Sequence, residues 1–181
     1  ISLDKPVYKE KLRLRAYGTP TDSSPVFLEI KKKYDGVVYK RRVSTDFAQA
    51  MRFLTEGIPP ESCDYVSRQV TAEIAHMIRR DGLIPRAAVF YDRRAFHGAD
   101  DPELRLTLDG NIRYRLGDLD LRNGTDGDTI PGQPFRIMEI KSASSIPLWL
   151  AGTLSELGIH PGSFSKYGSV YKQRFQDLCA T

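Results

Sequence analysis

The predicted β-strands of this chain carry Arg or Lys at alternate positions, and this pattern constrains the fold more than any other feature. In residues 11–16, KLRLRA, the apolar side chains alternate with basic ones, and a similar alternation of apolar and polar side chains returns in residues 104–109. Successive side chains of a strand point to opposite faces, so such a strand has one apolar face and one charged face. A sheet that gathers several basic faces builds a positive field that suits a multiply charged anion.

The length and composition limit which classes of protein this chain can belong to. A chain of 181 residues favours one domain, and the net charge of only +4 means that the placement of charge matters more than its total. No recognisable nucleic-acid module is present, so we expect no nucleic-acid partner. Cys63 and Cys179 form no CxxC pair and indicate free thiols in a reducing compartment. With no apolar run near the ~20 residues of a membrane span, we expect a cytoplasmic location.

The periodicity predicts more strands than helices. The strands are expected at residues 10–17, 26–34, 37–44, 86–94, 103–109, 111–116 and 135–142, with a tight turn at Asp35-Gly36. Helices are expected at residues 45–55, 62–81, 147–157 and 163–178, ending at Gly57 and Gly82 in the first two cases. Residues 118–133 are predicted to be a mobile loop. Hairpin links favour an antiparallel sheet, and at least seven strands in one sheet predict closure into a barrel. The predicted fold class is therefore α+β, with an antiparallel β-barrel.

Individual basic residues differ in how strongly they indicate function. Arg13 and Arg15 lie opposite a cleanly apolar face, which favours a functional role for that pair. The hairpin of residues 26–44 carries charge on both faces, so some of its cations are expected only to be solvated. Arg93 and Arg94 point opposite ways, and one of the two is expected to be structural. On the long helix of residues 62–81, Val66, Val70, Ile74, Met77 and Ile78 are predicted to form the buried stripe.

Glu139 is the one acidic residue on the face that it shares with Ile137 and Lys141. It is either a salt-bridge partner of the surrounding cations or a ligand for Mg²⁺ or Mn²⁺, which take oxygen ligands and bridge phosphate oxygens. The three scattered histidines show no zinc spacing, and no Walker loop, nucleophile elbow or dinucleotide fingerprint occurs. Trp149 is expected to anchor the core.

Several strings, taken in order, resemble the VTC domain of polyphosphate polymerases. They are KLRLR (residues 11–15) with YG (17–18), FLEIK (27–31), YKRR (39–42), YDRRAF (91–96), RLTLD (105–109), MEIK (138–141) and FSKY (164–167). Each string alone is weakly specific, but the ordered set is specific and extends over nearly the whole chain.

The VTC domain belongs to the triphosphate tunnel metalloenzymes, which are related to the CYTH proteins. The resemblance implies a tunnel of about eight antiparallel strands with helices packed outside, and transfer of the ATP γ-phosphate onto a growing polyphosphate chain. It implies ATP and polyphosphate or triphosphate as partners, with Mn²⁺ or Mg²⁺ as cofactor. The positions carried over as catalytic are Arg13, Arg15, Lys31, Lys40, Arg93 and Arg105. Tyr91, Ser165 and Lys166 match phosphate-binding positions of the tunnel, and Glu139 matches the metal-binding carboxylate.

The chain departs from the family pattern at its start. Family members begin with a further strand carrying acidic and lysine positions, followed by a Tyr-Phe-Asp-Thr-like segment, and this chain begins at Ile1 after both. We therefore expect residues 1–181 to be a VTC-type tunnel domain that lacks its N-terminal strand.

The same tunnel lining serves two other functions. One is an inorganic triphosphatase of the CYTH type, in which water replaces the phosphate acceptor, and the other is a polyphosphate or nucleotide sensor without turnover. The sequence leaves open the choice among the three, the preferred metal, the product length, the oligomeric state and a membrane-bound partner.

Overall fold

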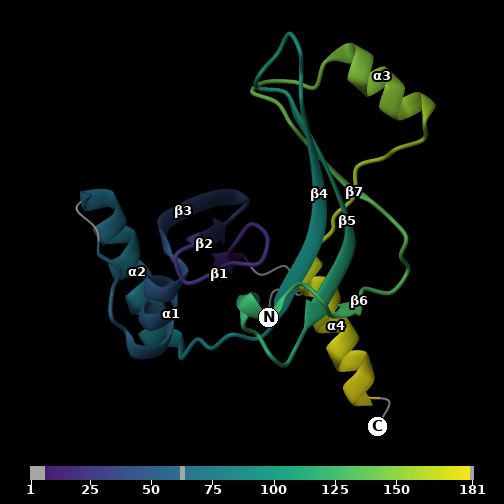
Figure 1. The fold of residues 1–181 in the computed structure, drawn as a ribbon. Helices are drawn as coiled ribbons and strands as arrows, with labels where there is room; N and C mark the ends of the chain where they lie inside the picture. The colour runs from purple at the N-terminus through teal and green to yellow at the C-terminus, as the bar shows by residue number, and fades with distance from the viewer. Residues whose placement is uncertain (1–6, 62–63, 180–181) are drawn as a thin grey trace. The chain divides into compact units, whose positions relative to one another are not determined.

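The computed structural model describes residues 7–61 and 64–179, and it divides into two compact units (Figure 1). The first unit comprises Ile1–Arg86 and Asp118–Thr125, and the second comprises Ala87–Gly117 and Asp126–Thr181. Each unit has its own sheet and its own hydrophobic core, and each is described by itself.

The first unit is built on a three-stranded antiparallel sheet of order β1-β2-β3. The strands are β1 (Tyr8–Arg15), β2 (Pro25–Tyr34) and β3 (Val37–Asp46). The hairpin between β2 and β3 turns at Asp35 and Gly36, whose φ values are 42° and 83°. Positive φ at both central residues matches the twist of the flanking strands, and the Asp-Gly dipeptide supplies it at low cost. The predicted hairpin is confirmed.

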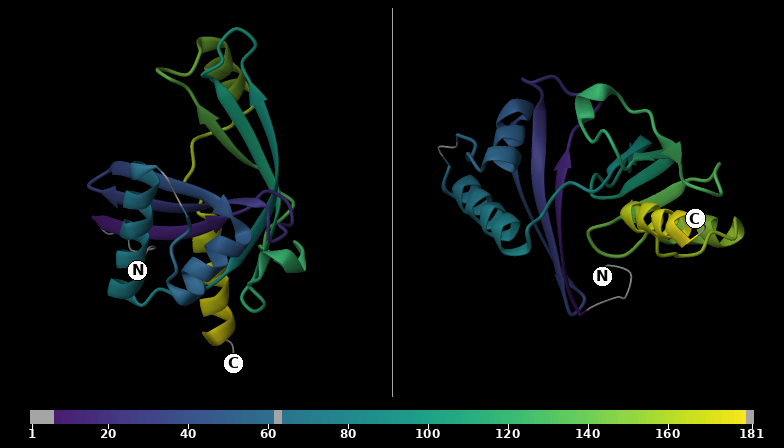
Figure 2. Two further views of the ribbon diagram at one scale, coloured as in Figure 1. Left: turned by 60° about the vertical axis from the view of Figure 1, so that its left-hand side comes forward. Right: turned by 90° about the horizontal axis from the view of Figure 1, so that it is seen from below.

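Two helices cover one face of this sheet (Figure 2). Helix α1 (Phe47–Glu56) starts at Asp46, whose carboxylate accepts the Gln49 N–H at 2.7 Å, and helix α2 (Tyr65–Asp81) has Asp64 in the same capping position. Gly57 and Gly82 end the two helices in the left-handed conformation, as predicted. The predicted start of the second helix at Ser62, like Cys63, lies outside the described residues.

The core of the first unit lies between the sheet and these helices. Alternate residues of β2 and β3 meet apolar residues of α1 and α2, giving a cluster of Val26, Leu28, Ile30, Val43, Phe47, Ala50, Phe53, Val70, Ile74 and Met77. Val66 was predicted to belong to the buried stripe of α2, but it is 58% exposed. It lies in the first turn of the helix, and the buried stripe begins one turn later, at Val70.

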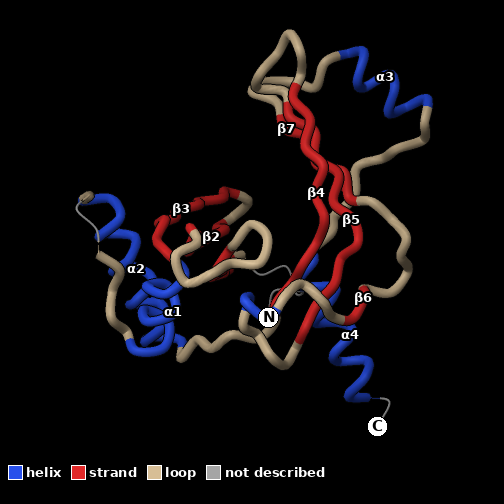
Figure 3. Tube along the Cα trace, in the orientation of Figure 1, coloured by secondary structure: helices blue, strands red, loops and turns tan. Residues whose placement is uncertain are grey.

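The second unit contains a four-stranded antiparallel sheet, in which β5 is the central strand (Figure 3). Its strands are β4 (Ala88–His97), β5 (Arg105–Arg115), β6 (Asp128–Thr129) and β7 (Ile137–Lys141). β4 pairs with one edge of β5, while β6 and β7 pair with the C-terminal and N-terminal halves of β5 respectively.

The structure corrects the prediction of two strands at residues 103–116. Residues 105–115 instead form one continuous strand, with a bulge at Asn111 and Ile112. Between the pairs Phe90–Arg113 and Asp92–Gly110, two residues of β5 face one residue of β4, and Asn111 takes a φ of 50°. Asn tolerates a positive φ, so the strand accommodates one extra residue here and continues.

Two helices belong to the second unit. Helix α4 (Lys166–Cys179) contributes Val170 to a core that it shares with Ile112, Tyr114 and Ile130. Helix α3 (Leu148–Glu156) buries Leu150, but Trp149 is 65% exposed, so the expectation that Trp149 anchors the core is wrong. The segment of residues 118–133, predicted as a loop, contains a short 3₁₀ helix, η1 (Leu121–Asn123), and the strand β6.

The α+β class and the antiparallel pairing are confirmed. The strands of the described residues form two sheets, where the sequence analysis predicted one, and their pairings contain no closed barrel. Among the described residues, no helix combines the length and the apolarity needed to cross a bilayer.

Ile74 and Val66, on the same helix, give a matched test of this core. Ile74→Ala removes a fully buried side chain between α2 and the sheet, and we expect it to lower the free energy of unfolding by about 2–5 kcal/mol. Val66→Ala, at an exposed position, should change it by less than about 0.5 kcal/mol. Urea denaturation followed by circular dichroism measures both, and equal losses for the two variants would contradict the described packing.

Candidate anion-binding site

One face of the first unit's sheet carries basic residues from all three strands. The register places Arg13 beside Glu29 and Glu29 beside Arg42, and it places Lys31 between Lys11 and Lys40. Arg15 follows on the same face, opposite Phe27. Because side chains alternate along each strand, all these residues lie on the face opposite the helices. The structure thus brings together the predicted site residues Arg13, Arg15, Lys31 and Lys40.

Glu29 organises this face. Its side chain is only 2% exposed, and one of its carboxylate oxygens accepts hydrogen bonds from Arg13 Nε at 2.9 Å and from Arg13 Nη2. Lys40 Nζ lies 3.1 Å from the other oxygen, and Arg15 Nε lies 3.7 Å from the first. A buried carboxylate needs such partners, because an uncompensated buried charge is costly. Glu29 therefore holds three cations from two strands, β1 and β3, at fixed positions.

The pKa of Glu29 reports this arrangement. Burial raises it, but the hydrogen bonds from Arg13 and Lys40 and the nearby positive charges lower it by more, so the pKa lies below its ordinary value. Glu29 is accordingly ionised at neutral pH and holds its partners in position.

A second cluster, in the second unit, has the same design around Asp109. The guanidinium group of Arg93 donates two hydrogen bonds to the Asp109 carboxylate, from Nε to Oδ1 at 2.6 Å and from Nη2 to Oδ2 at 2.8 Å. Lys166, at the start of α4, donates to Oδ2 at 2.6 Å. The side chain of Asp109 is only 3% exposed. The carboxylate thus joins β4, β5 and α4 at one point.

The protonation states in this cluster follow from the contacts. Burial raises the pKa of Asp109, while the hydrogen bonds from Arg93 and Lys166 lower it further than burial raises it, so the net shift is downward. The hydrogen bond from Arg93 to Asp109 in turn raises the pKa of Arg93. Asp109 and Arg93 are both charged at neutral pH.

The other predicted residues of the second unit lie near this cluster or along the same face. The ring of Tyr91 lies under Arg93, at 5.4 Å from Cζ to the ring centroid, and under Lys166, at 4.4 Å from Nζ. Ser165 precedes Lys166, and its hydroxyl accepts the Gly168 N–H at 3.1 Å. Arg105 is at the far end of the same face of β5, between His97 and Lys141.

Glu139 stands between the two ends of that face. Its carboxylate is 49% exposed, with Lys141 Nζ at 3.2 Å and Arg93 Nη2 at 3.9 Å. The carboxylate is therefore reachable from solvent and is one oxygen donor for a hard cation. Among the described residues, no group of three or more His, Cys, Asp or Glu could hold a metal. Mg²⁺ or Mn²⁺ would fit here only if this one carboxylate shared it with water and the oxygens of a bound anion.

Glu29 and Asp109 are the functional residues that the sequence analysis missed. Both were visible in the alternation, since Glu29 shares a face with Lys31, and Asp109 shares one with Arg105. The sequence pattern does not show that these two carboxylates are buried. Their burial comes from cations on neighbouring strands and on a helix that begins at residue 166. A lone acidic residue within an otherwise basic face was the available signal.

The comparison with known families agrees with this geometry. The sequence profile of the VTC domain matches residues 2–175, which is nearly the whole chain. The chain therefore belongs to the VTC domain family, and its membership supports a role connected with polyphosphate. A search of curated proteins gave no match.

The variant Asp109→Asn tests the second cluster through the pH dependence of the free energy of unfolding. Because the pKa of Asp109 is lowered in the folded state, its stabilisation is present above the ordinary Asp pKa of about 3.9 and is lost as the pH falls through the folded value. We expect Asp109→Asn to lower the free energy of unfolding by about 2–3 kcal/mol at pH 7 and to matter progressively less below about pH 4.

The matched control is Asp92→Asn. Asp92 is 67% exposed and pairs with Arg113 at 3.3 Å, so its removal should cost less than about 1 kcal/mol. Urea denaturation at a series of pH values measures both variants. A loss for Asp109→Asn that does not depend on pH would show that the carboxylate does not act through its charge.

Proposed function

We propose that this chain is a metal-dependent phosphotransferase that transfers the γ-phosphate of ATP onto a growing polyphosphate chain inside a basic tunnel. The observation that carries the proposal is the pair of cation clusters, each held by a buried carboxylate, at Glu29 and at Asp109. Membership of the VTC domain family supports a role connected with polyphosphate.

The arginines position the phosphates in this proposal. A guanidinium group is a planar fork that binds two phosphate oxygens at once, and its orientation fixes the orientation of the phosphate. Glu29 holds the fork of Arg13, and Asp109 holds that of Arg93, so neither side chain must be ordered when the substrate arrives. Preorganised charges of this kind stabilise the charge on the equatorial oxygens of the transferred phosphoryl group.

The lysines and Tyr91 complete the lining. Lys31, Lys40 and Lys166 provide point charges, and the ring of Tyr91 limits where Lys166 and Arg93 can move. A tunnel that excludes water would strengthen each of these contacts. The divalent ion, bound at Glu139 and the triphosphate, would neutralise part of the phosphate charge.

No side chain acts as a covalent nucleophile in this account. The terminal phosphate oxygen of the acceptor chain attacks the γ-phosphorus, the bond from that phosphorus to the bridging oxygen of ADP breaks, and ADP leaves with the electron pair. The protein supplies in-line positioning and charge neutralisation.

Incubation with ATP and Mn²⁺, followed by gel electrophoresis of the products, tests the proposal. Long phosphate chains are the expected product. Orthophosphate released from triphosphate without chain growth would instead support the CYTH-type triphosphatase, and tight binding without any product would support the sensor.

The arginine fork can be tested separately from its charge. Arg15→Lys keeps the charge but loses the bidentate geometry, so we expect triphosphate affinity to fall by about tenfold, or ~1.4 kcal/mol. Arg52→Lys, at an exposed position on α1, is the control and should leave the affinity unchanged. Isothermal titration with tripolyphosphate measures both, and unchanged affinity for Arg15→Lys would show that charge alone suffices.

Glu139→Gln distinguishes a metal ligand from a salt-bridge partner. The substitution nearly preserves shape, and the carboxylate is half exposed with only weak ion pairs, so the melting temperature should stay near that of the unmodified protein. We expect polyphosphate binding to persist and Mn²⁺-dependent turnover to fall by at least about a hundredfold. A lower melting temperature with normal turnover per folded molecule would assign Glu139 a structural role.

A further inference from the structure

Helix α3, which follows β7 in the second unit (Figure 1), presents apolar side chains to solvent. Leu148 is 91% exposed, Trp149 is 65% exposed, and Leu157, directly after the helix, is 67% exposed. Of the residues of α3, all of which the structure describes, Leu150 alone is buried. A helix with apolar residues around its circumference is ordinarily covered on all sides, so the exposed part of α3 indicates a missing neighbour.

The position of Gly152 marks the outer side of α3. At about 100° per residue, the buried Leu150 and the half-buried Leu154 share the inner side, and Leu148, Trp149 and Gly152 lie on the outer side. A Cβ at Gly152 would meet no atom within 4 Å. A glycine inside a helix lowers helix stability, and no packing within the described chain requires it here. Trp149 thus protrudes beside a gap at Gly152, and the two features complement each other.

Charge is scarce around this surface. Residues 142–165 contain one formally charged side chain, that of Glu156, whereas 28% of the whole chain is charged. Two copies of the surface can therefore meet without the repulsion that like charges cause. A lipid bilayer fits less well, because membrane-surface helices carry Lys or Arg beside their apolar face to attract anionic headgroups, and this segment has neither.

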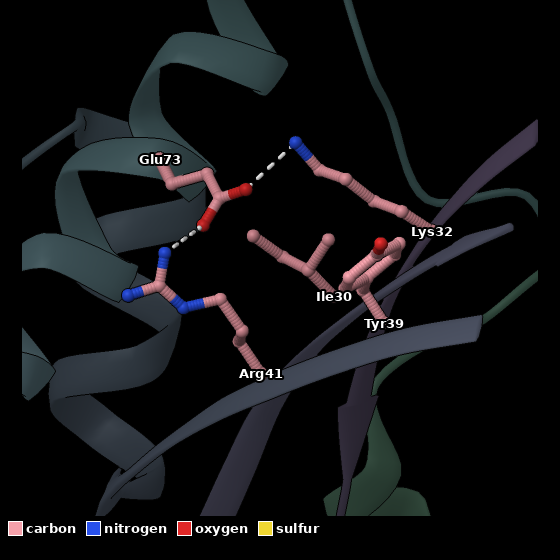
Figure 4. Close-up of a pocket in the computed structure, with 5 residues that line it drawn as sticks. All are labelled: Ile30, Lys32, Tyr39, Arg41 and Glu73. Atoms are coloured by element: carbon pink, nitrogen blue, oxygen red, sulfur yellow. Dashed lines mark hydrogen bonds and ion pairs between the residues drawn. The ribbon is translucent and has the colours of Figure 1, made fainter. Parts of the chain in front are cut away.

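The first unit offers a hollow that differs in this respect. Ile30, Lys32, Tyr39, Arg41 and Glu73 line a volume of about 240 Å³ (Figure 4). Its charged groups pair with one another, since Glu73 lies 2.7 Å from Lys32 Nζ and 3.0 Å from Arg41 Nη1. The hollow is thus neutralised from within the chain, whereas no described part of the chain covers the outer side of α3.

The size of the exposed surface matches what a weak dimer needs. With Ile146 and Ile159, which are 44% and 43% exposed, residues 146–159 expose on the order of 500 Å² of apolar side chain, at the upper end of the largest patch on a typical monomer. Two copies would bury about 1,000 Å², near the lower limit for a specific interface. We therefore expect association in the micromolar range of protein concentration.

We propose that two copies of this chain associate through α3, with the two helices antiparallel across a two-fold axis beside Trp149 and Gly152. In such an isologous pair each Trp149 lies over the Gly152 of the other copy, so the protrusion of one helix fills the gap of the other. Aromatic side chains that fill a pocket carry much of the binding energy of interfaces. The inference is independent of the proposed function, because it uses neither of the cation clusters.

Trp149 is the only tryptophan of the chain, so its fluorescence reports on this surface directly. The test measures the molar mass of the unmodified protein by sedimentation, and its fluorescence emission, over about 1–200 μM protein. We expect monomer to be converted to dimer over this range. The emission should move to shorter wavelength along the same curve, because the indole ring leaves water as the dimer forms.

Gly152→Gln tests the packing of the two helices. Glutamine is a good helix former, so the variant should fold at least as well as the unmodified protein, but its side chain fills the gap that receives Trp149. We expect the dissociation constant of the dimer to rise at least about tenfold. Ala151→Gln is the matched control, because it adds the same side chain about 100° around the helix and should leave the dissociation constant unchanged. Leu148→Gln, which removes apolar surface without filling the gap, should also weaken association.

Three results would overturn the inference. One is a molar mass that remains that of the monomer up to about 200 μM. Another is the same dissociation constant for Gly152→Gln and Ala151→Gln. The third is Trp149 emission that responds to vesicles of phosphatidylcholine and phosphatidylglycerol but not to protein concentration, which would assign α3 to a lipid bilayer. A melting curve of each variant, recorded where the unmodified protein is monomeric, confirms that the variant is folded.

Discussion

Cations that are crowded on one face of a sheet repel one another, and in each unit of this chain one buried carboxylate counteracts that repulsion. Glu29 does so for Arg13, Arg15 and Lys40, and Asp109 does so for Arg93 and Lys166. Each carboxylate is ionised because its partners lower its pKa by more than burial raises it. The basic surface depends on these two carboxylates, since they set the direction in which the guanidinium groups of Arg13 and Arg93 point.

The arrangement of the strands decides which residues share such a cluster. Antiparallel register brings Arg13, Glu29 and Arg42 into one row although they are far apart in the sequence. The opposite face of the sheet packs against α1 and α2, whose acidic residues pair its cations, as Glu73 does for Lys32 and Arg41. One sheet therefore carries a neutralised charged network on its covered side and a positively charged surface on the other. A face of that second kind suits a linear, densely charged anion.

The sequence was sufficient for the local structure and for much of the site. Alternation identified the strands and the shared face of Arg13 and Arg15, and Asp35-Gly36 identified the hairpin, because both signals come from short-range geometry. It was insufficient where neighbours decide the outcome. The break predicted between residues 109 and 111 is instead a bulge at Asn111 and Ile112 within one strand that pairs with β4. The burial of Glu29 and Asp109 depends on side chains from other strands and from α4. Trp149 was misassigned because its size says nothing about which elements cover it.

The central claim is that a buried carboxylate in each unit positions cations that bind phosphate. Side-chain NMR of the arginine Nε–Hε groups during a titration with tripolyphosphate tests it most directly, because Arg13 reports the Glu29 cluster and Arg93 reports the Asp109 cluster. The account predicts that both signals shift and saturate as tripolyphosphate is added. A signal that does not respond would contradict it and would mean that its cluster does not bind phosphate.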